Sequence, residues 1–175
     1  MIRLQQSIET YIAAKDGNRP HLMAKAFAPD ATLQMHVKTA AIAFPAVTHG
    51  IDAIANVLVS DFGGRYENVY TFCIGAPPEN NEPFDGDWMV FMTEKGSGLV
   101  RAGSGRYRWR CVDQTGIASS LAITIEEMAV LPAAQADPVF RWACCLPYPW
   151  CSREFLAENT PGIAVVESIV RAFGV

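Results

Sequence analysis

The chain has 175 residues, of which 50% are hydrophobic and 18% are charged, and its formal net charge is −4. A chain of this length and composition buries enough surface to fold as a globular domain, which excludes disordered, coiled-coil and collagen-like proteins. The negative balance also argues against a nucleic-acid partner, because phosphate binding requires clustered positive charge.

The start of the sequence and its longest apolar run predict a cytoplasmic protein without a membrane partner. The first ten residues contain no basic segment followed by an apolar one, so we predict no signal peptide. The longest apolar run, residues 40–47, is too short to cross a bilayer, which takes about 20 apolar residues.

The cysteines, histidines and glycines do not form a cofactor motif. The five cysteines include the adjacent pair Cys144 and Cys145, and an odd count with such a pair does not predict a disulfide framework. Paired Cys-x-x-Cys elements are missing, the three histidines lack metal-ligand spacing, and no glycine-rich segment opens a helix as a nucleotide loop requires. We therefore predict no metal and no cofactor.

The first third of the chain predicts helices. Leu4, Ile8 and Tyr11 recur at helical spacing and predict a helix that ends at Asp16–Gly17. A short second helix begins near Pro20, which suits a first helical turn, and Pro29 stops it.

A strand and a third helix follow. Residues 31–37 alternate between apolar and polar side chains and predict a strand. An apolar loop over residues 40–47 leads to a third helix over residues 51–62, which Gly63–Gly64 should close.

The second half predicts strands and then a change of character. Gly103 and Gly105 lie inside a predicted strand and indicate a bulge or bend. After Pro132 the chain is rich in proline and bulky side chains, and a final helix is predicted from Thr160–Pro161. We predict a main domain over residues 1–132 and a C-terminal helical extension, residues 133–175, packed on it. The predicted strands cover residues 69–74, 88–93, 99–112 and 118–131.

Five segments in this order resemble the NTF2-like superfamily, in particular its SnoaL-like branch. They are residues 11–17, 27–33, 49–54, 105–109 and 121–128, and the resemblance spans roughly residues 5–131. It implies an α+β cone, in which three N-terminal helices pack on a curved mixed or antiparallel sheet. The superfamily holds ketosteroid isomerases, dehydratases, epoxide hydrolases, polyketide cyclases and proteins that only bind, so the fold does not settle function.

Tyr11 and Asp16 are the candidate catalytic residues that the resemblance suggests. The place of Tyr11 on the first helix is similar to that of the oxyanion-hole tyrosine of ketosteroid isomerases, and a buried phenol can stabilise a developing enolate. The Tyr11–Asp16 spacing resembles that of scytalone and bile-acid dehydratases, in which the pair orients a histidine or a water. Alternatively, Tyr11 continues the core stripe of its helix, and Asp16 belongs to an ordinary helix-ending turn.

The sequence departs from these mechanisms at the positions of the base. The isomerase aspartate on the first strand corresponds to Met35, the second oxyanion-hole acid would fall near Gly105, and no histidine follows His49. His36 neighbours Met35, but strand alternation directs it to the opposite face, so we interpret it as a surface or interface residue. Neither the isomerase nor the dehydratase mechanism therefore finds all of its residues in this sequence.

Alternation along residues 106–110 sets the expected faces of the long strand. The resemblance places Tyr107 and Trp109 toward the cavity, which leaves Arg106, Arg108 and Arg110 on the outer face. We expect Glu126 and Glu127 of the neighbouring strand to pair with these arginines, and related proteins dimerise through this face. A homodimer through the sheet face is predicted, with an anion site as the alternative.

We predict an apolar pocket that binds a hydrophobic small molecule. One hypothesis is an acid/base isomerase, dehydratase or cyclase acting on a ring compound; the other is a non-catalytic binding or dimeric assembly protein. The predicted lining residues are Tyr11, Leu33, Met35, Val57, Trp88, Tyr107 and Trp109.

Overall fold

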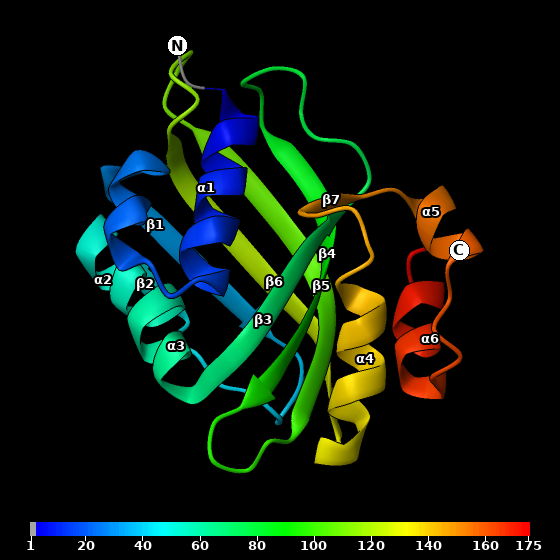
Figure 1. Ribbon diagram of the computed structural model, residues 1–175. Helices are drawn as coiled ribbons and strands as arrows, with labels where there is room; N and C mark the ends of the chain where they lie inside the picture. The colour runs from blue at the N-terminus through cyan, green and yellow to red at the C-terminus, as the bar shows by residue number, and fades with distance from the viewer. Residues whose placement is uncertain (1–2) are drawn as a thin grey trace.

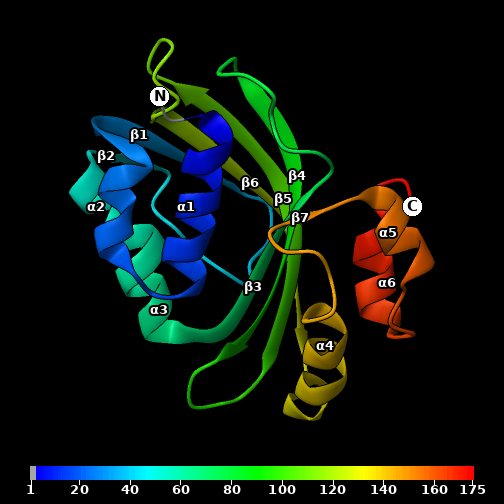
Figure 2. The same ribbon diagram turned by 45° about the horizontal axis from the view of Figure 1, so that its top comes forward.

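A strongly curved seven-stranded sheet runs through the molecule, with helices on both of its faces (Figure 1). These coordinates come from a computed structural model that describes residues 3–175. The N-terminal helices lie on the concave face and the C-terminal helices on the convex face, as Figure 2 shows with the sheet seen nearly edge-on. The predicted α+β cone, a curved sheet with helices at its open side, is confirmed.

The N-terminal helical region ends later than the glycines predict. A helix α1, Leu4–Asp16, and a 3₁₀ turn are followed by α2, Ile51–Ala55, a π-helical segment and α3, Asp61–Arg65. The expected stop at Gly63–Gly64 is wrong, because Gly63 lies inside α3. A Cβ at Gly63 would lie 2.6 Å from Cγ of Asn18, so glycine here permits close helix packing against the turn after α1 rather than termination.

The sheet is mixed. Its strand order is β2-β1-β6-β5-β4-β3-β7, with β1 parallel to β6 and β3 parallel to β7, and with antiparallel neighbours elsewhere. The strands are β1 (Phe27–Val37), β2 (Val47–His49), β3 (Tyr66–Ile74), β4 (Phe84–Glu94), β5 (Val100–Cys111), β6 (Ala118–Leu131) and β7 (Trp150–Cys151).

The predicted bulge in the long strand is confirmed. The register of β5 against β6 shifts between Ser104 and Gly105. A Cβ at Gly105 would lie 1.8 Å from the carbonyl oxygen of Thr124 and 2.8 Å from Cζ2 of Trp88, so only glycine fits. The missing side chain allows the Trp88 indole to lie against the strand and form part of the concave face.

The sheet separates two hydrophobic clusters. The concave cluster packs α1 and the helices after β2 against inward side chains such as Leu33 and Trp109. The convex cluster packs α4, α5 and α6 against Phe72, Met89 and Phe91. Both faces of the same strands are therefore apolar, as is typical of a sheet covered on both sides.

Residues 133–175 supply the cover on the convex face. A 3₁₀ turn, Ala133–Gln135, leads into α4, Ala136–Ala143; α5, Arg153–Glu158, and α6, Ala164–Arg171, follow β7. The sequence did not predict α4 or α5, which are short. Pro138 is tolerated in α4 because it lies in the first turn, where a backbone N–H has no intrahelical partner.

The last helix begins later than expected. Gly162 has a φ of +70° and Ile163 is extended, so the backbone turns before α6 instead of continuing from Pro161. Its buried residues Val166, Ile169 and Val170 then face the convex cluster.

The segment around β7 fastens the C-terminal region to the edge of the sheet. The backbone N–H of Cys73 in β3 donates to the carbonyl of Pro149 at 2.7 Å. Trp150 Nε1 donates to Glu9 Oε1 of α1 at 2.9 Å, and Arg153 forms an ion pair with Asp87 of β4 at 2.6 Å. The segment thus contacts both the sheet and the concave-side helix.

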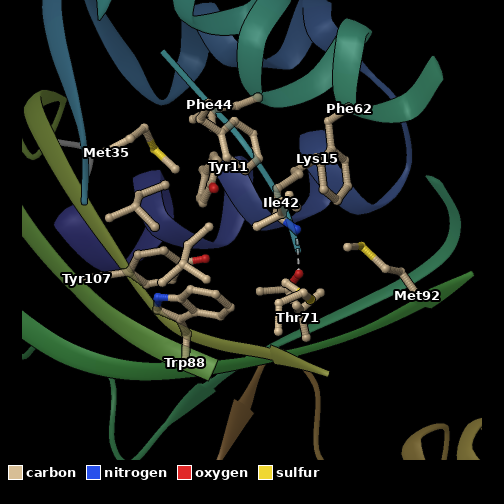
Figure 3. Close-up of a pocket in the computed structure, with 15 residues that line it drawn as sticks. Tyr11, Lys15, Met35, Ile42, Phe44, Phe62, Thr71, Trp88, Met92 and Tyr107 are labelled. Carbon is tan, nitrogen blue, oxygen red and sulfur yellow. Dashed lines mark hydrogen bonds between the residues drawn. The ribbon is translucent and has the colours of Figure 1, made fainter. Parts of the chain in front are cut away.

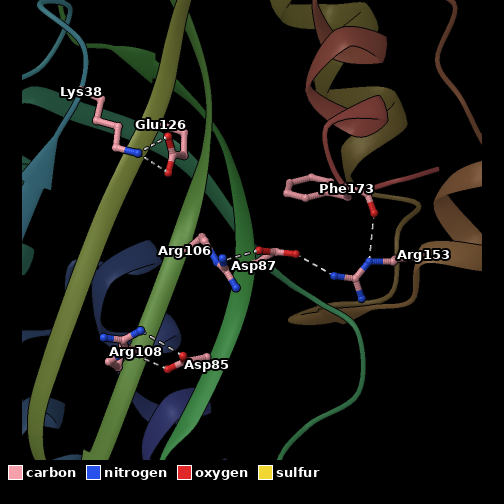
Figure 4. A network of polar contacts seen from close by, with 8 residues as sticks. All are labelled: Lys38, Asp85, Asp87, Arg106, Arg108, Glu126, Arg153 and Phe173. Atoms are coloured by element: carbon pink, nitrogen blue, oxygen red, sulfur yellow. Dashed lines mark hydrogen bonds and ion pairs between the residues drawn. The ribbon is translucent and has the colours of Figure 1, made fainter.

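Arg106, Arg108 and Arg110 of β5 are exposed on the convex face, as predicted, but the partners of Arg106 and Arg108 differ from those expected (Figure 4). Arg106 pairs with Asp87 at 3.5 Å and Arg108 with Asp85 at 3.1 Å. These aspartates stand directly opposite the arginines in the β4–β5 register.

The expected pairs with Glu126 and Glu127 are therefore wrong. The register opposite Arg106 on β6 is Thr124. Glu126 instead pairs with Lys38 at 2.8 Å, and Glu127 accepts a hydrogen bond from Ser104 Oγ at 3.2 Å.

The helices of residues 3–175 are all too short or too polar to cross a bilayer.

Candidate functional site: a small cavity under helix α1

A cavity of about 40 Å³ lies between α1 and the concave face of the sheet (Figure 3). It holds no more than a few water molecules, because one water needs roughly 10–15 Å³ by the same measure. Most of its lining is aliphatic or aromatic. The lining residues are Tyr11, Lys15, Met35, Ile42, Phe44, Leu58, Phe62, Thr71, Trp88, Val90, Met92, Tyr107, Ile123, Ile125 and Met128.

Helix α1 contributes two polar side chains to the cavity. Tyr11 and Lys15 are one turn apart and share the helix face of Leu4 and Ile8, which is buried against the sheet. The Lys15 side chain is only 8% exposed, which is exceptional for an ammonium group. Figure 3 shows it reaching into the cavity between Phe62 and Thr71.

Lys15, Asp16 and Thr71 form a compact polar network. The Lys15 Nζ donates to Asp16 Oδ1 at 3.0 Å and to Thr71 Oγ1 at 2.5 Å. It also lies 4.9 Å from the centre of the Phe62 ring, a distance at which the aromatic face attracts a cation. A buried charge requires such pairing, because the transfer of an unpaired charge from water into the protein interior is very costly.

Asp16 has no free acceptor position. Besides the Lys15 bond, it accepts the Thr71 hydroxyl at 2.8 Å and the Thr71 backbone N–H at 2.7 Å. The Tyr148 hydroxyl of the C-terminal region donates to its other oxygen at 2.8 Å. A carboxylate offers about four acceptor positions, so these four hydrogen bonds saturate it. The Asp16 carboxylate is not part of the cavity lining, whereas its partners Lys15 and Thr71 are.

Two phenols face the same cavity. Tyr11 is packed edge-on against Tyr107 and Trp109, at centroid distances of 6.1 and 5.4 Å. Burial raises the pKa of the Tyr11 phenol, an effect that hydrogen bonding with Tyr107 partly offsets. Burial, followed by the nearby Tyr11, also raises the pKa of Tyr107. Both phenols are therefore neutral at physiological pH, and one of their two hydroxyl protons is used in the hydrogen bond between them.

Trp88 forms the floor beside Tyr107. Its ring stacks on the Tyr107 ring at 5.5 Å with an interplanar angle of 23°. The indole Nε1 is buried and finds no hydrogen-bond acceptor among the residues that the structure describes. Buried donors without partners are uncommon in folded proteins.

The loop between β1 and β2 closes the cavity from the side. Its residues Ile42 and Phe44 line the cavity and also line a second hollow of about 90 Å³ next to α3. Phe62 is shared by both hollows as well, so these three side chains separate them. Arg101 of β5 donates to the carbonyl of Ala41 at 2.8 Å and thereby holds the loop in place.

The predicted lining residues are not all brought to one cavity. Tyr11, Met35, Trp88 and Tyr107 line it. Leu33 and Trp109 are fully buried in the surrounding cluster, and Val57 lines the second hollow. The three histidines, at positions 21, 36 and 49, are all exposed, so none supplies a base from inside.

The sequence interpretation overlooked Lys15. A signal was present: positions 4, 8, 11 and 15 fall on one helix face, so a lysine occupies the apolar stripe of α1. Thr71, 56 positions away, could not be recognised as its partner from local pattern.

No metal site is evident. Residues 3–175 contain no group of three or more His, Cys, Asp or Glu side chains that could hold an ion. The five cysteines are free thiols, and burial raises the pKa of Cys73 to about 12 and that of Cys151 to about 11.

Neither a protein-family model nor a curated protein sequence matches the chain. Solved structures do match it. An NTF2-like protein from Burkholderia thailandensis has a TM-score of 0.55 at 18% identity, over 78% of this chain and 98% of that one. The chain has the NTF2-like fold. A hypothetical protein with a ketosteroid isomerase-like fold from Catenulispora acidiphila, in complex with trimethylamine, gives a TM-score of 0.54 at 17% identity, over 67% and 83% of the two chains.

An LEH-like epoxide hydrolase from M. tuberculosis shares this fold, with a TM-score of 0.51 at 10% identity, over 70% of this chain and 81% of that one. Identities this low compare folds rather than sites. The SnoaL-like branch therefore stays a prediction.

Proposed function

We propose that the concave cavity binds a small, largely apolar molecule. The observation that carries the proposal is the combination of neutral phenols and one ammonium group in an otherwise apolar, buried lining. Ligand sites typically combine apolar walls with a few fixed polar groups. Burying such groups is costly wherever one of their donors is left without an acceptor, which favours a binding role over a purely structural one.

The cavity must widen to accept a ring compound. Its volume of about 40 Å³ is far below the roughly 300–1,000 Å³ of typical ligand sites. Ile42 and Phe44 belong to a loop rather than to the sheet, and a second hollow lies on their far side. We propose that these side chains move aside and join the two hollows when a ligand enters.

The second candidate function is acid/base catalysis of the isomerase, dehydratase or cyclase kind. Tyr11 supports it, because a neutral buried phenol can donate to a developing oxyanion. A base is missing from the lining: it holds no carboxylate and no imidazole, and Asp16 is saturated. We therefore favour binding, and propose a structural role for Asp16.

Deuterium exchange separates the two functions. Cyclohexanone would be incubated with the protein in D₂O and followed by ¹H NMR for loss of the protons next to its carbonyl. Binding without exchange above the buffer rate supports a binding protein. Accelerated exchange that is lost in Tyr11→Phe supports catalysis, and absence of any binding contradicts the proposed function.

We also retain the homodimer, the cytoplasmic location and the boundary after residue 132 as proposals. Residues 133–175 cover part of the convex face, which leaves the region around Arg106 and Arg108 for a second copy. Light scattering tests this directly: Arg108→Glu should lower the mass from dimer to monomer, and a monomeric unsubstituted protein contradicts the dimer.

A further inference from the structure

We infer that Lys15 anchors the polar end of the ligand, and that this end is a neutral acceptor oxygen, such as that of a ketone, rather than an anion. The inference rests on the proposed function, since it names the ligand class of that same cavity. It assigns a binding role to Lys15.

The first step is the donor count at Lys15. An ammonium group has three N–H donors. Two of them donate to Asp16 Oδ1 and Thr71 Oγ1, and the part of the chain that the structure describes offers no third acceptor. The remaining side of the group meets the Phe62 face and the cavity. One strong donor in the cavity is thus open to a ligand.

The second step is the charge. Asp16 already neutralises Lys15, with the two side chains 8% and 7% exposed. An anion bonded to the Lys15 Nζ would lie within about 6 Å of Asp16 Oδ1, because each hydrogen bond spans about 3 Å. Two buried like charges at that distance repel strongly. A cationic ligand would be repelled by the Lys15 ammonium itself, so the charges around the cavity favour a neutral ligand.

The third step is the remaining lining. Tyr11 and Tyr107 are hydrogen-bonded to each other, so only one of their two hydroxyl protons is left for a ligand. Apart from the unpartnered Trp88 indole N–H, the other walls are mainly hydrophobic. A ring with one acceptor oxygen matches this set: the ring replaces water at the apolar walls, and the oxygen takes the open donor. A hydrocarbon would leave that donor without an acceptor.

The test compares three six-membered-ring probes: cyclohexanone, cyclohexanecarboxylate and benzene. Dissociation constants would be measured by NMR titration for the unsubstituted protein and for Phe44→Ala, in which loss of the benzyl group makes room for a ring. Lys15→Met is then added to Phe44→Ala, with Lys25→Met as the matched control on an exposed lysine. Thermal unfolding of each variant checks folding.

We expect Lys15→Met to weaken cyclohexanone binding about tenfold, in line with loss of a hydrogen bond from a charged donor, and Lys25→Met to leave it unchanged. Benzene binding should not weaken in Lys15→Met. The carbonyl stretch of bound cyclohexanone should lie at lower frequency with Lys15 than with methionine. This infrared shift does not depend on the stability of the variant.

Each other outcome has a distinct meaning. If the carboxylate binds most tightly through Lys15, or if cyclohexanone binding and its carbonyl stretch do not depend on Lys15, the inference is overturned while the proposed pocket stands. If none of the three probes binds the protein or Phe44→Ala, the proposed function fails together with the inference.

Discussion

The two faces of the sheet are both apolar, but within residues 3–175 only the concave face keeps buried donors without an acceptor. On the convex face, α4, α5 and α6 form a cluster of hydrophobic residues with the strands. On the concave face, the cluster surrounds a cavity that holds Lys15, Tyr11 and Tyr107. A buried donor without an acceptor costs about 1–3 kcal/mol, and for this reason we propose that the face that retains one is the functional face.

From this difference between the faces we propose a packing role for the C-terminal region and a binding role for α1. The two are linked at one point, where Tyr148 donates to Asp16. Asp16 thus belongs to the support of the cavity: it positions Lys15 from α1 and Thr71 from β3, and it is itself held from the C-terminal segment.

The largest effect should follow a charge placed in the convex cluster. Ile169 is fully buried in α6, whereas Val165 in the same helix is 38% exposed. We expect Ile169→Asp to lower the unfolding free energy by about 4 kcal/mol or more, because a buried carboxylate without a partner is strongly destabilising. This change in unfolding free energy is measured by urea unfolding. Val165→Asp is the control, and equal effects of the two would contradict the packing role of α6.

Asp16→Asn should have the next largest effect. It removes the counter-charge of a buried ammonium, which typically costs about 3–5 kcal/mol. Asp61→Asn, on the exposed side of α3, should cost less than about 0.5 kcal/mol. Stability unchanged in Asp16→Asn, measured by the same unfolding experiment, would contradict its supporting role and restore Asp16 as a candidate base.

Tyr148→Phe should have a smaller effect, because it removes one of four hydrogen bonds to Asp16. We expect a loss of about 1 kcal/mol. Tyr70→Phe is the matched control, since the hydroxyl of Tyr70 takes part in none of the hydrogen bonds found within residues 3–175. A Tyr148→Phe variant as stable as the unsubstituted protein would mean that the Tyr148–Asp16 hydrogen bond does not contribute to the free energy of unfolding.

Mildly alkaline pH, up to about 9, should lower the stability only weakly and on both faces alike. Each face holds one buried thiol, Cys73 or Cys151, whose pKa burial raises from an ordinary 9.0 to about 12 or about 11. The unfolded chain therefore releases these protons first. The contribution of these thiols to stability is complete well below pH 9, and it falls as the pH rises through 9 toward 11–12.

At pH 9 each thiol should account for a loss of about 0.4 kcal/mol. Unfolding measured at pH 7 and pH 9 should show this loss, and Cys73→Ala should remove the Cys73 share of it. A stability that rises between pH 7 and pH 9 would contradict the burial of these thiols.

Much of the fold was predictable because its signals are local. The stripe of α1, the alternation that turns Tyr107 inward and Arg106 outward, and the bulge at Gly105 each depend on a few neighbouring residues. The helix α4 was missed because it is short and contains Pro138.

The site was less predictable because its contacts are distant in sequence. Tyr11 lies on the buried face of α1, as the helical period predicts. The role of Asp16 depends on Thr71 and Tyr148, which lie 55 and 132 positions away. The loop residues Ile42 and Phe44 have no periodic pattern, so their place in the cavity follows only from the strands that the loop connects.

The methionines offer the most direct test of a ligand site on the concave face. Met35, Met92 and Met128 line the cavity, whereas Met89 is buried in the convex cluster. In protein labelled with ¹³C at the methionine methyl groups, cyclohexanone would be titrated into Phe44→Ala and followed by two-dimensional NMR. The account predicts chemical-shift changes of the methyl signals of Met35, Met92 and Met128, whereas the Met89 signal stays unchanged. Shifts confined to Met89, or no saturable shift at any methionine, would contradict it.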